Sequence, residues 1–170
     1  MATVISGAAA RPAARSIAPD RYERILSCAA IVLLAAVAIA LFKGRADWAR
    51  VPFAVWPHLA TIVVALALTP VILLRRRGDR RHRVLGTIWV TAMLLTAISS
   101  LFLRTGGRFS VIHVLSVWTL IQVPILWWRA RTHDVAAHRS GVRGIVTGAL
   151  LIAGFFTFPF DRMLGHWLFG

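Results

Sequence analysis

Cysteine and acidic residues are scarce in this chain, and their scarcity excludes several kinds of chemistry. Cys28 is the only cysteine, so the sequence has no Cys-x-x-Cys pair and no covalent c-type haem attachment. None of the six Asp and Glu residues lies in the middle of an apolar segment, which argues against a carboxylate proton relay or an ion-coupled carrier. Walker, Gly-x-Ser-x-Gly and His-Glu-x-x-His motifs are also absent, so a hydrolase is not expected.

Apolar residues are abundant instead. They make up 58% of the 170 residues, and the mean hydropathy is +0.73, which is typical of an integral membrane protein. Five apolar segments are long enough for a helix across a hydrocarbon layer of about 30 Å. With Asp79 and Asp134 as N-caps, the predicted fold class is all-α, with five transmembrane helices at about 25–42, 51–74, 80–103, 109–128 and 135–160. Residues 25–170 form a single membrane domain that ends in an interfacial tail at 161–170.

The net charge of +14 is distributed as in a membrane protein rather than a nucleic-acid-binding protein. Most of the 20 Lys and Arg residues lie in 1–24, 75–83 and 129–143. These regions fall on one side of the predicted membrane, so the positive-inside rule predicts a cytoplasmic N-terminus and a C-terminus outside. Residues 1–24 are predicted to be a disordered cytoplasmic tail. The expected location is the bacterial inner membrane, with the lipid bilayer and not nucleic acid as the partner.

A repeat of about 55 residues carries four histidines. The first copy contains His58, Pro70, Arg75, Arg77, Asp79 and His82, and the second contains His113, Pro124, Arg129, Arg131, Asp134 and His138. Each copy is a helical hairpin, and both hairpins have the same orientation in the membrane. Helices 2–5 are therefore predicted to form a four-helix bundle of two parallel repeats.

The spacing of the histidines places them in two layers. In a sequential bundle, helices 2 and 4 lie on one diagonal and helices 3 and 5 on the other. His58 and His113 then form an outer pair, and His82 and His138 an inner pair near the headgroups. Two imidazoles about a bundle diagonal apart suit the axial positions of a haem better than a lone zinc ion. The four histidines are therefore predicted to ligate the iron of one or two haem b groups.

Structural roles for the same histidines stay open. His58 and His113 could bond each other, or bond Thr61 and Ser116, and so fix helix packing. His82 and His138 could bind phosphate headgroups at the cytoplasmic surface. His133, next to Asp134 in the inner loop, is the one competitor to His138 as a ligand.

Two resemblances accompany these patterns. Histidines on four successive helices, paired 2-with-4 and 3-with-5, resemble the arrangement in cytochrome b561. That resemblance implies two b haems and electron transfer across the membrane. In sequence, the stretches 81–86, 112–116 and 137–139 resemble a bacterial membrane family called domain of unknown function 2306. This second resemblance covers about residues 55–170 and implies a multi-span membrane protein.

The leading hypothesis is a membrane b-type cytochrome-like protein that passes electrons across the inner membrane through bis-histidine haem. It would act as a transmembrane oxidoreductase subunit, with a quinol or a redox protein as partner. A non-enzymatic membrane scaffold or assembly subunit with structural histidines is the alternative. A transition-metal or haem carrier is a second alternative. No feature of the sequence indicates an oligomeric state.

Overall fold

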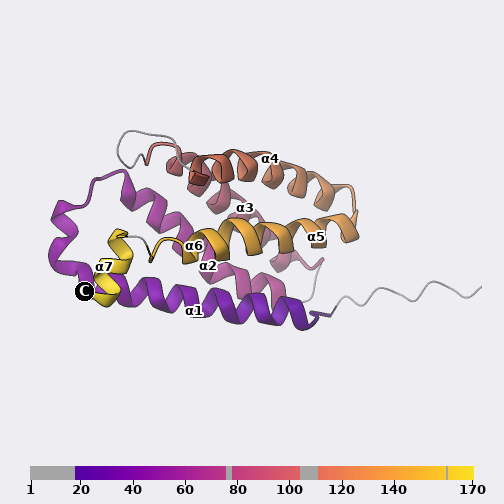
Figure 1. The fold of residues 1–170 in the computed structure, drawn as a ribbon. Helices are drawn as coiled ribbons and strands as arrows, with labels where there is room; N and C mark the ends of the chain where they lie inside the picture. Colours follow the sequence, from indigo (N-terminus) through magenta and orange to yellow (C-terminus); the bar gives the residue numbers. More distant parts are fainter. Residues whose placement is uncertain (1–17, 76–77, 104–110, 160) are drawn as a thin grey trace, which may run out of the picture.

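The computed structural model describes residues 18–75, 78–103, 111–159 and 161–170, and every regular element in these ranges is helical. Figure 1 shows long helices that lie roughly along one common direction, with the chain running back and forth between the two ends of the molecule. The elements are α1 (Arg21–Lys43), η1 (Gly44–Arg50), α2 (Val55–Leu74), α3 (Arg80–Ser100), α4 (Val111–Arg131), α5 (Val135–Ile145), η2 (Val146–Ile152), α6 (Ala153–Phe155) and α7 (Met163–Phe169). The predicted all-α fold class is confirmed for this part of the chain.

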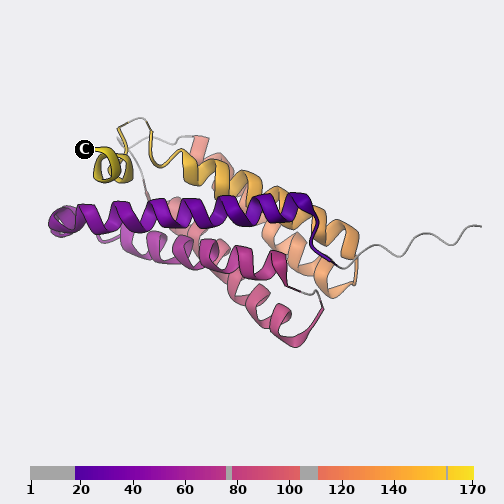
Figure 2. The same cartoon turned by 90° about the horizontal axis from the view of Figure 1, so that it is seen from below.

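Successive helices are packed side by side, and the last one returns to the first. Each of α1, α2, α3 and α4 packs against the next helix along the chain. The elements α5, η2 and α6 form one continuous helix, and η2 also contacts α1, α2 and α4. Viewed from below, α1 lies between α2 and this final helix (Figure 2). The helix α1 is therefore part of the bundle, in addition to the four helices that carry the repeat.

Three helical stretches are long and apolar enough to cross a membrane, among the residues that the structure describes. They are Arg21–Arg50, Val55–Leu74 and Arg80–Phe102. Large apolar side chains such as Val32, Phe42 and Val114 point outward, as expected for a surface in contact with lipid. The further spans that we predicted on α4 and on the helix starting at α5 stay predictions.

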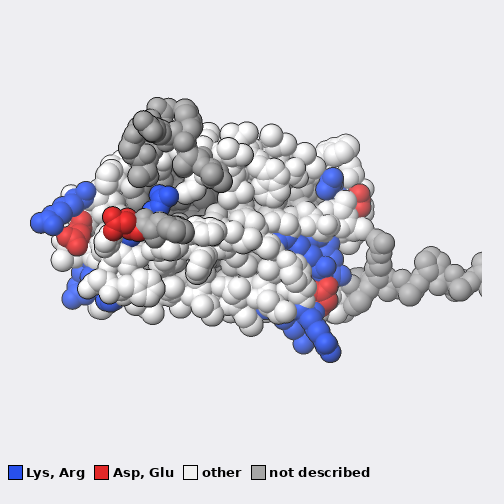
Figure 3. Space-filling view, viewed as in Figure 1, with Lys and Arg blue, Asp and Glu red and all other residues white. Residues whose placement is uncertain are grey.

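Charged side chains gather at the two ends of the elongated molecule. The surface between the ends is mostly free of charge on the face shown in Figure 3. An uncharged band between charged ends is the pattern expected of helices that sit in a bilayer.

Short polar signals set the starts of three helices. Asp79 caps α3 by accepting a hydrogen bond from the main-chain N–H of His82, and Asp134 caps α5 by accepting one from Ala137. Both starts are those predicted from the sequence. By contrast, α1 begins at Arg21, four residues earlier than predicted, because Asp20 and Glu23 form a capping box there. Residues 1–17 of the predicted tail 1–24 lie outside the described residues.

Most of the C-terminal segment predicted as an interfacial tail is the short helix α7. Helix α7 packs against the end of α1, and Leu164 and Gly165 are buried. The Lys43 ammonium at the end of α1 donates a hydrogen bond to the Leu168 carbonyl, which ties the two segments together.

The Asp79 cap leads to a prediction about acid stability. The main-chain N–H of His82, aided by Arg75, holds the pKa of Asp79 below its ordinary value of 3.8. A depressed pKa means that the cap stabilises the fold above pH 3.8 and that this stabilisation is lost as the pH falls through the folded-state pKa. Asp79→Ala is expected to lower the thermal midpoint by a few degrees at neutral pH and to make no difference in strong acid. Circular dichroism melts of the purified protein at both pH values would check this, with Asp47→Ala, in an exposed ion pair, as the control.

Candidate functional site

Two of the predicted histidines line one cavity. His82, in the first turn of α3, and His138, in the first turn of α5, both face a cavity of about 630 Å³. Residues of α2, α4 and η2 complete its walls. We call it the His82–His138 cavity. Its volume lies within the range typical of sites for small molecules and cofactors.

The ring of His138 is fixed by α4. Its Nδ1 lies 3.2 Å from the main-chain carbonyl oxygen of Leu126, a residue that is itself buried. A carbonyl can only accept, so Nδ1 carries the proton and Nε2 is the basic nitrogen of the neutral ring. Metal-binding histidines commonly donate one ring N–H to a backbone carbonyl in this way and bind the metal through the other nitrogen.

His82 lines the same cavity from α3, whereas His138 belongs to α5. Asp79 fixes the start of α3, which sets the position of His82 on the first turn. The ring nitrogen Nδ1 of His82 is buried. His133 also lines the cavity, and it has a left-handed backbone with φ of 60° in the loop between α4 and α5. The structure therefore adds His133 to the same site as His82 and His138.

Aromatic and cationic side chains complete the walls. Trp89 is buried, and its indole N–H donates to the Thr69 hydroxyl at 3.0 Å, which fixes the flat ring at the cavity wall. Arg83 and Arg131 also line the cavity. Arginine binds carboxylates well, because its planar guanidinium can donate two parallel hydrogen bonds.

The outer histidines are not brought together in the same way. His58 faces a second cavity, of about 530 Å³, which we call the His58 cavity. Its Nδ1 lies 3.1 Å from the Thr96 carbonyl oxygen and 3.2 Å from the Ser99 hydroxyl, so it bonds to α3. His113 is only 5% exposed and is not among the described residues that line this cavity.

The set of possible metal ligands is small. In the described ranges, no group of three or more His, Cys, Asp or Glu side chains is placed to hold a metal ion. A zinc site usually needs four such ligands, so the two histidines that line this cavity are better suited to a ligand that brings its own coordinating atoms.

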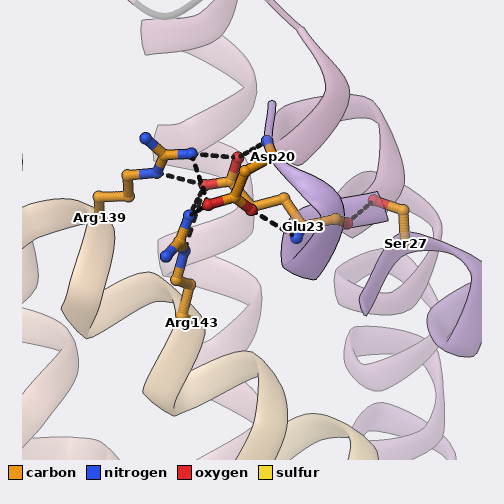
Figure 4. Close-up of polar contacts among 5 residues, drawn as sticks. All are labelled: Asp20, Glu23, Ser27, Arg139 and Arg143. Atoms are coloured by element: carbon orange, nitrogen blue, oxygen red, sulfur yellow. Dashed lines mark hydrogen bonds and ion pairs between the residues drawn. The ribbon is translucent and has the colours of Figure 1, made fainter. Parts of the chain in front are cut away.

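A cluster of two carboxylates and two arginines lies beside His138. Figure 4 shows Arg139 and Arg143 of α5 converging on Asp20 and Glu23 at the start of α1. The Arg139 guanidinium contacts both carboxylate oxygens of Glu23, at 2.7 and 2.9 Å. Arg143 contacts Glu23 at 3.1 Å and also pairs with Asp20. We call these four residues the α1–α5 ion cluster.

Burial and polarity distinguish this cluster from a surface ion pair. Glu23 is only 1% exposed, although it carries a charge that is paired with two guanidinium groups. The N–H of Glu23, and after it Arg143, lower the pKa of Asp20, so this carboxylate stays ionised. From the sequence we assigned these arginines to the cytoplasmic surface and missed the contact. The one available signal was Asp20-x-x-Glu23, because it places two acids in an otherwise basic stretch.

These features define a helical membrane protein with a cavity that two histidines from different helices line. The chain belongs to the family described as predicted membrane protein (DUF2306), whose match covers residues 55–158. The match includes all four histidines of the repeat but not α1, which contributes Glu23. No curated protein and no solved structure matches the chain.

Proposed function

We propose that the protein is a membrane b-type haem protein that transfers electrons, with His82 and His138 as the axial ligands. The observation that carries the proposal is that both histidines line one cavity although they belong to different helices. Two histidines at one site could together hold the iron of a haem. The cavity volume and the buried Trp89 beside the two histidines support this fit.

The residues of the chain would divide the work of such a site. The Leu126 carbonyl holds His138 in the tautomer whose Nε2 can coordinate iron. Arg83 and Arg131 line the same cavity and would neutralise the two carboxylates of a haem. Apolar side chains of α2 and η2, such as Ile72 and Val146, would pack against the flat ring of a haem. Haem would supply one-electron chemistry, and the protein would set where it sits.

The proposal includes the topology that we expect from the sequence. The chain would cross the bacterial inner membrane five times as two parallel hairpin repeats after α1, with its N-terminus in the cytoplasm. The excess of basic residues in 75–83 and 129–143 supports this orientation. The His82–His138 cavity would then lie near the cytoplasmic surface, where a soluble acceptor could approach it.

The simplest test of the proposed function is an absorption spectrum. Protein expressed with added haem and purified in detergent is expected to show a Soret shift and an α-band in its reduced-minus-oxidised spectrum. Free haem in the same detergent is the control, because it lacks two protein ligands. A protein that purifies folded but has no such bands would contradict the proposal.

A structural role is the better interpretation of the outer histidines. His58 joins α2 to α3 through the Thr96 carbonyl and the Ser99 hydroxyl. A non-enzymatic scaffold with structural histidines is therefore the second candidate function. The two candidates differ in two measurable respects. A scaffold would have no haem-dependent spectrum, and it would keep its stability when His82 and His138 are both replaced.

A further inference from the structure

The His58 cavity has a wall of polar atoms within apolar surroundings. It has a volume of about 530 Å³ and lies at the end of the bundle opposite the His82–His138 cavity. Apolar side chains such as Leu66 and Met93 form much of its surface. His58 and four buried hydroxyl residues also line it: Thr96, Ser100, Ser116 and Thr119. Polar residues inside a membrane bundle are costly and usually functional.

The hydroxyl protons of this wall are already used within the protein. Ser116 and Thr119 each donate to the carbonyl four residues earlier in α4, at 2.8 Å. Thr96 donates to the Thr61 hydroxyl at 2.8 Å. The Ser100 hydroxyl lies 2.7 Å from the Ala97 carbonyl oxygen and 2.5 Å from the Ser116 hydroxyl, so these two serines also share a hydrogen bond. Each oxygen can still accept a further hydrogen bond. The hydroxyl wall therefore offers acceptors and few donors.

His58 adds an acceptor of the same kind. Its Nδ1 donates to the Thr96 carbonyl, which is an acceptor only, so its Nε2 is the basic nitrogen. The buried hydroxyls of the wall and His58 therefore favour a ligand that donates hydrogen bonds, whereas Asp161 and Arg162, which also line the cavity, lie at the start of α7. An acyl chain has no donor, and a quinone has only acceptor oxygens.

We propose that the His58 cavity binds a membrane quinol, with the apolar walls around its ring and the wall acceptors at its hydroxyl groups. A quinol is apolar enough to reach the cavity from the bilayer, and its two O–H groups supply the donors that the wall requires. A quinol bound here would be the electron donor of the proposed function. Only this use of the quinol rests on the proposed function. Binding itself needs no haem.

The test compares a ligand that has two hydrogen-bond donors with one in which methyl groups replace them. A short-chain ubiquinol and its dimethyl ether are titrated against the purified wild-type protein in detergent by isothermal calorimetry, under anaerobic conditions. Two hydrogen bonds of ordinary strength predict about tenfold tighter binding of the quinol. Equal affinity for the two ligands, or no binding of the quinol, would overturn the proposal.

A pair of variants locates the site. Replacing Ser116 with Ala together with Thr119→Val is expected to remove most of the tenfold preference, since it deletes two acceptors. Thr87→Val is the matched control, because Thr87 lines the other cavity, and it should keep the preference. Ala149→Leu fills part of the His58 cavity and should weaken both ligands alike. A preference that persists in the Ser116 and Thr119 variant contradicts the assignment.

The same titration separates this proposal from the haem proposal. A His82→Ala, His138→Ala double variant is expected to bind the quinol as the wild type does. Quinol preference in that variant, without any haem spectrum in the wild type, would refute the proposed function alone. A haem spectrum without quinol preference would refute the quinol site alone.

Discussion

Replacing Glu23 with Ala is expected to lower the free energy of unfolding by about 3 kcal/mol. The substitution removes the buried one of the two carboxylates that Arg139 and Arg143 both contact, and it leaves them only the partly exposed Asp20. Because Glu23 is almost fully buried, water cannot replace the lost contacts at that position. The arginines are partly exposed, so the expected loss lies at the lower end of the range for broken buried pairs.

The measurement is unfolding of the purified protein in mixed micelles with increasing denaturing detergent. Glu23→Gln keeps the shape of the side chain and removes only its charge, so it should recover a minor part of the loss. Asp47→Ala, which breaks an exposed ion pair with Arg50, is the matched control and should change stability by less than about 1 kcal/mol. A Glu23→Ala protein as stable as this control would show that the α1–α5 ion cluster does not hold the two helices together.

Replacing His138 or His82 with Ala is expected to abolish stable haem binding. Either variant would remove one of the two histidine nitrogens that would hold the iron. The haem content of the purified variants should fall at least tenfold, as measured by the pyridine haemochrome assay. His138→Ala also removes the hydrogen bond to Leu126, so its circular dichroism spectrum is needed to show that the fold is retained.

Two histidine variants serve as controls for this prediction. His133→Ala removes the third histidine of the same cavity, and His113→Ala removes a buried histidine that does not line it. Both should keep their haem. If His133→Ala lost the haem while His138→Ala kept it, the ligand assignment would be wrong, and the left-handed loop residue would be the ligand instead.

The sequence was sufficient to predict features that depend on local signals. The apolar segments mark α1 to α4, and Asp79 and Asp134 mark the starts of α3 and α5. The repeat also predicts that His82 and His138 lie at the same end of the bundle, because each follows its cap by three or four residues. Capping and periodicity act within one or two turns, so they can be identified without knowing the packing.

Other features depend on how the helices rotate and pack, and they could not be predicted. His58 bonds to α3 and not to His113, since the rotation of α2 about its axis is set by its contacts with α1 and α3. The contact between Glu23 and Arg139 joins residues more than a hundred positions apart. The predicted helix 135–160 ends at Phe155. It also contains the π-helical segment η2, which a hydrophobic period of 3.6 residues does not reveal.

The most direct test of the central claim is the electron paramagnetic resonance spectrum of the oxidised wild-type protein, purified with its haem. Two imidazole ligands make ferric haem low-spin, so the account predicts a low-spin signal that disappears in the His82→Ala, His138→Ala double variant. A high-spin signal, or a low-spin signal that persists in the double variant, would contradict the assignment of His82 and His138 as the axial ligands.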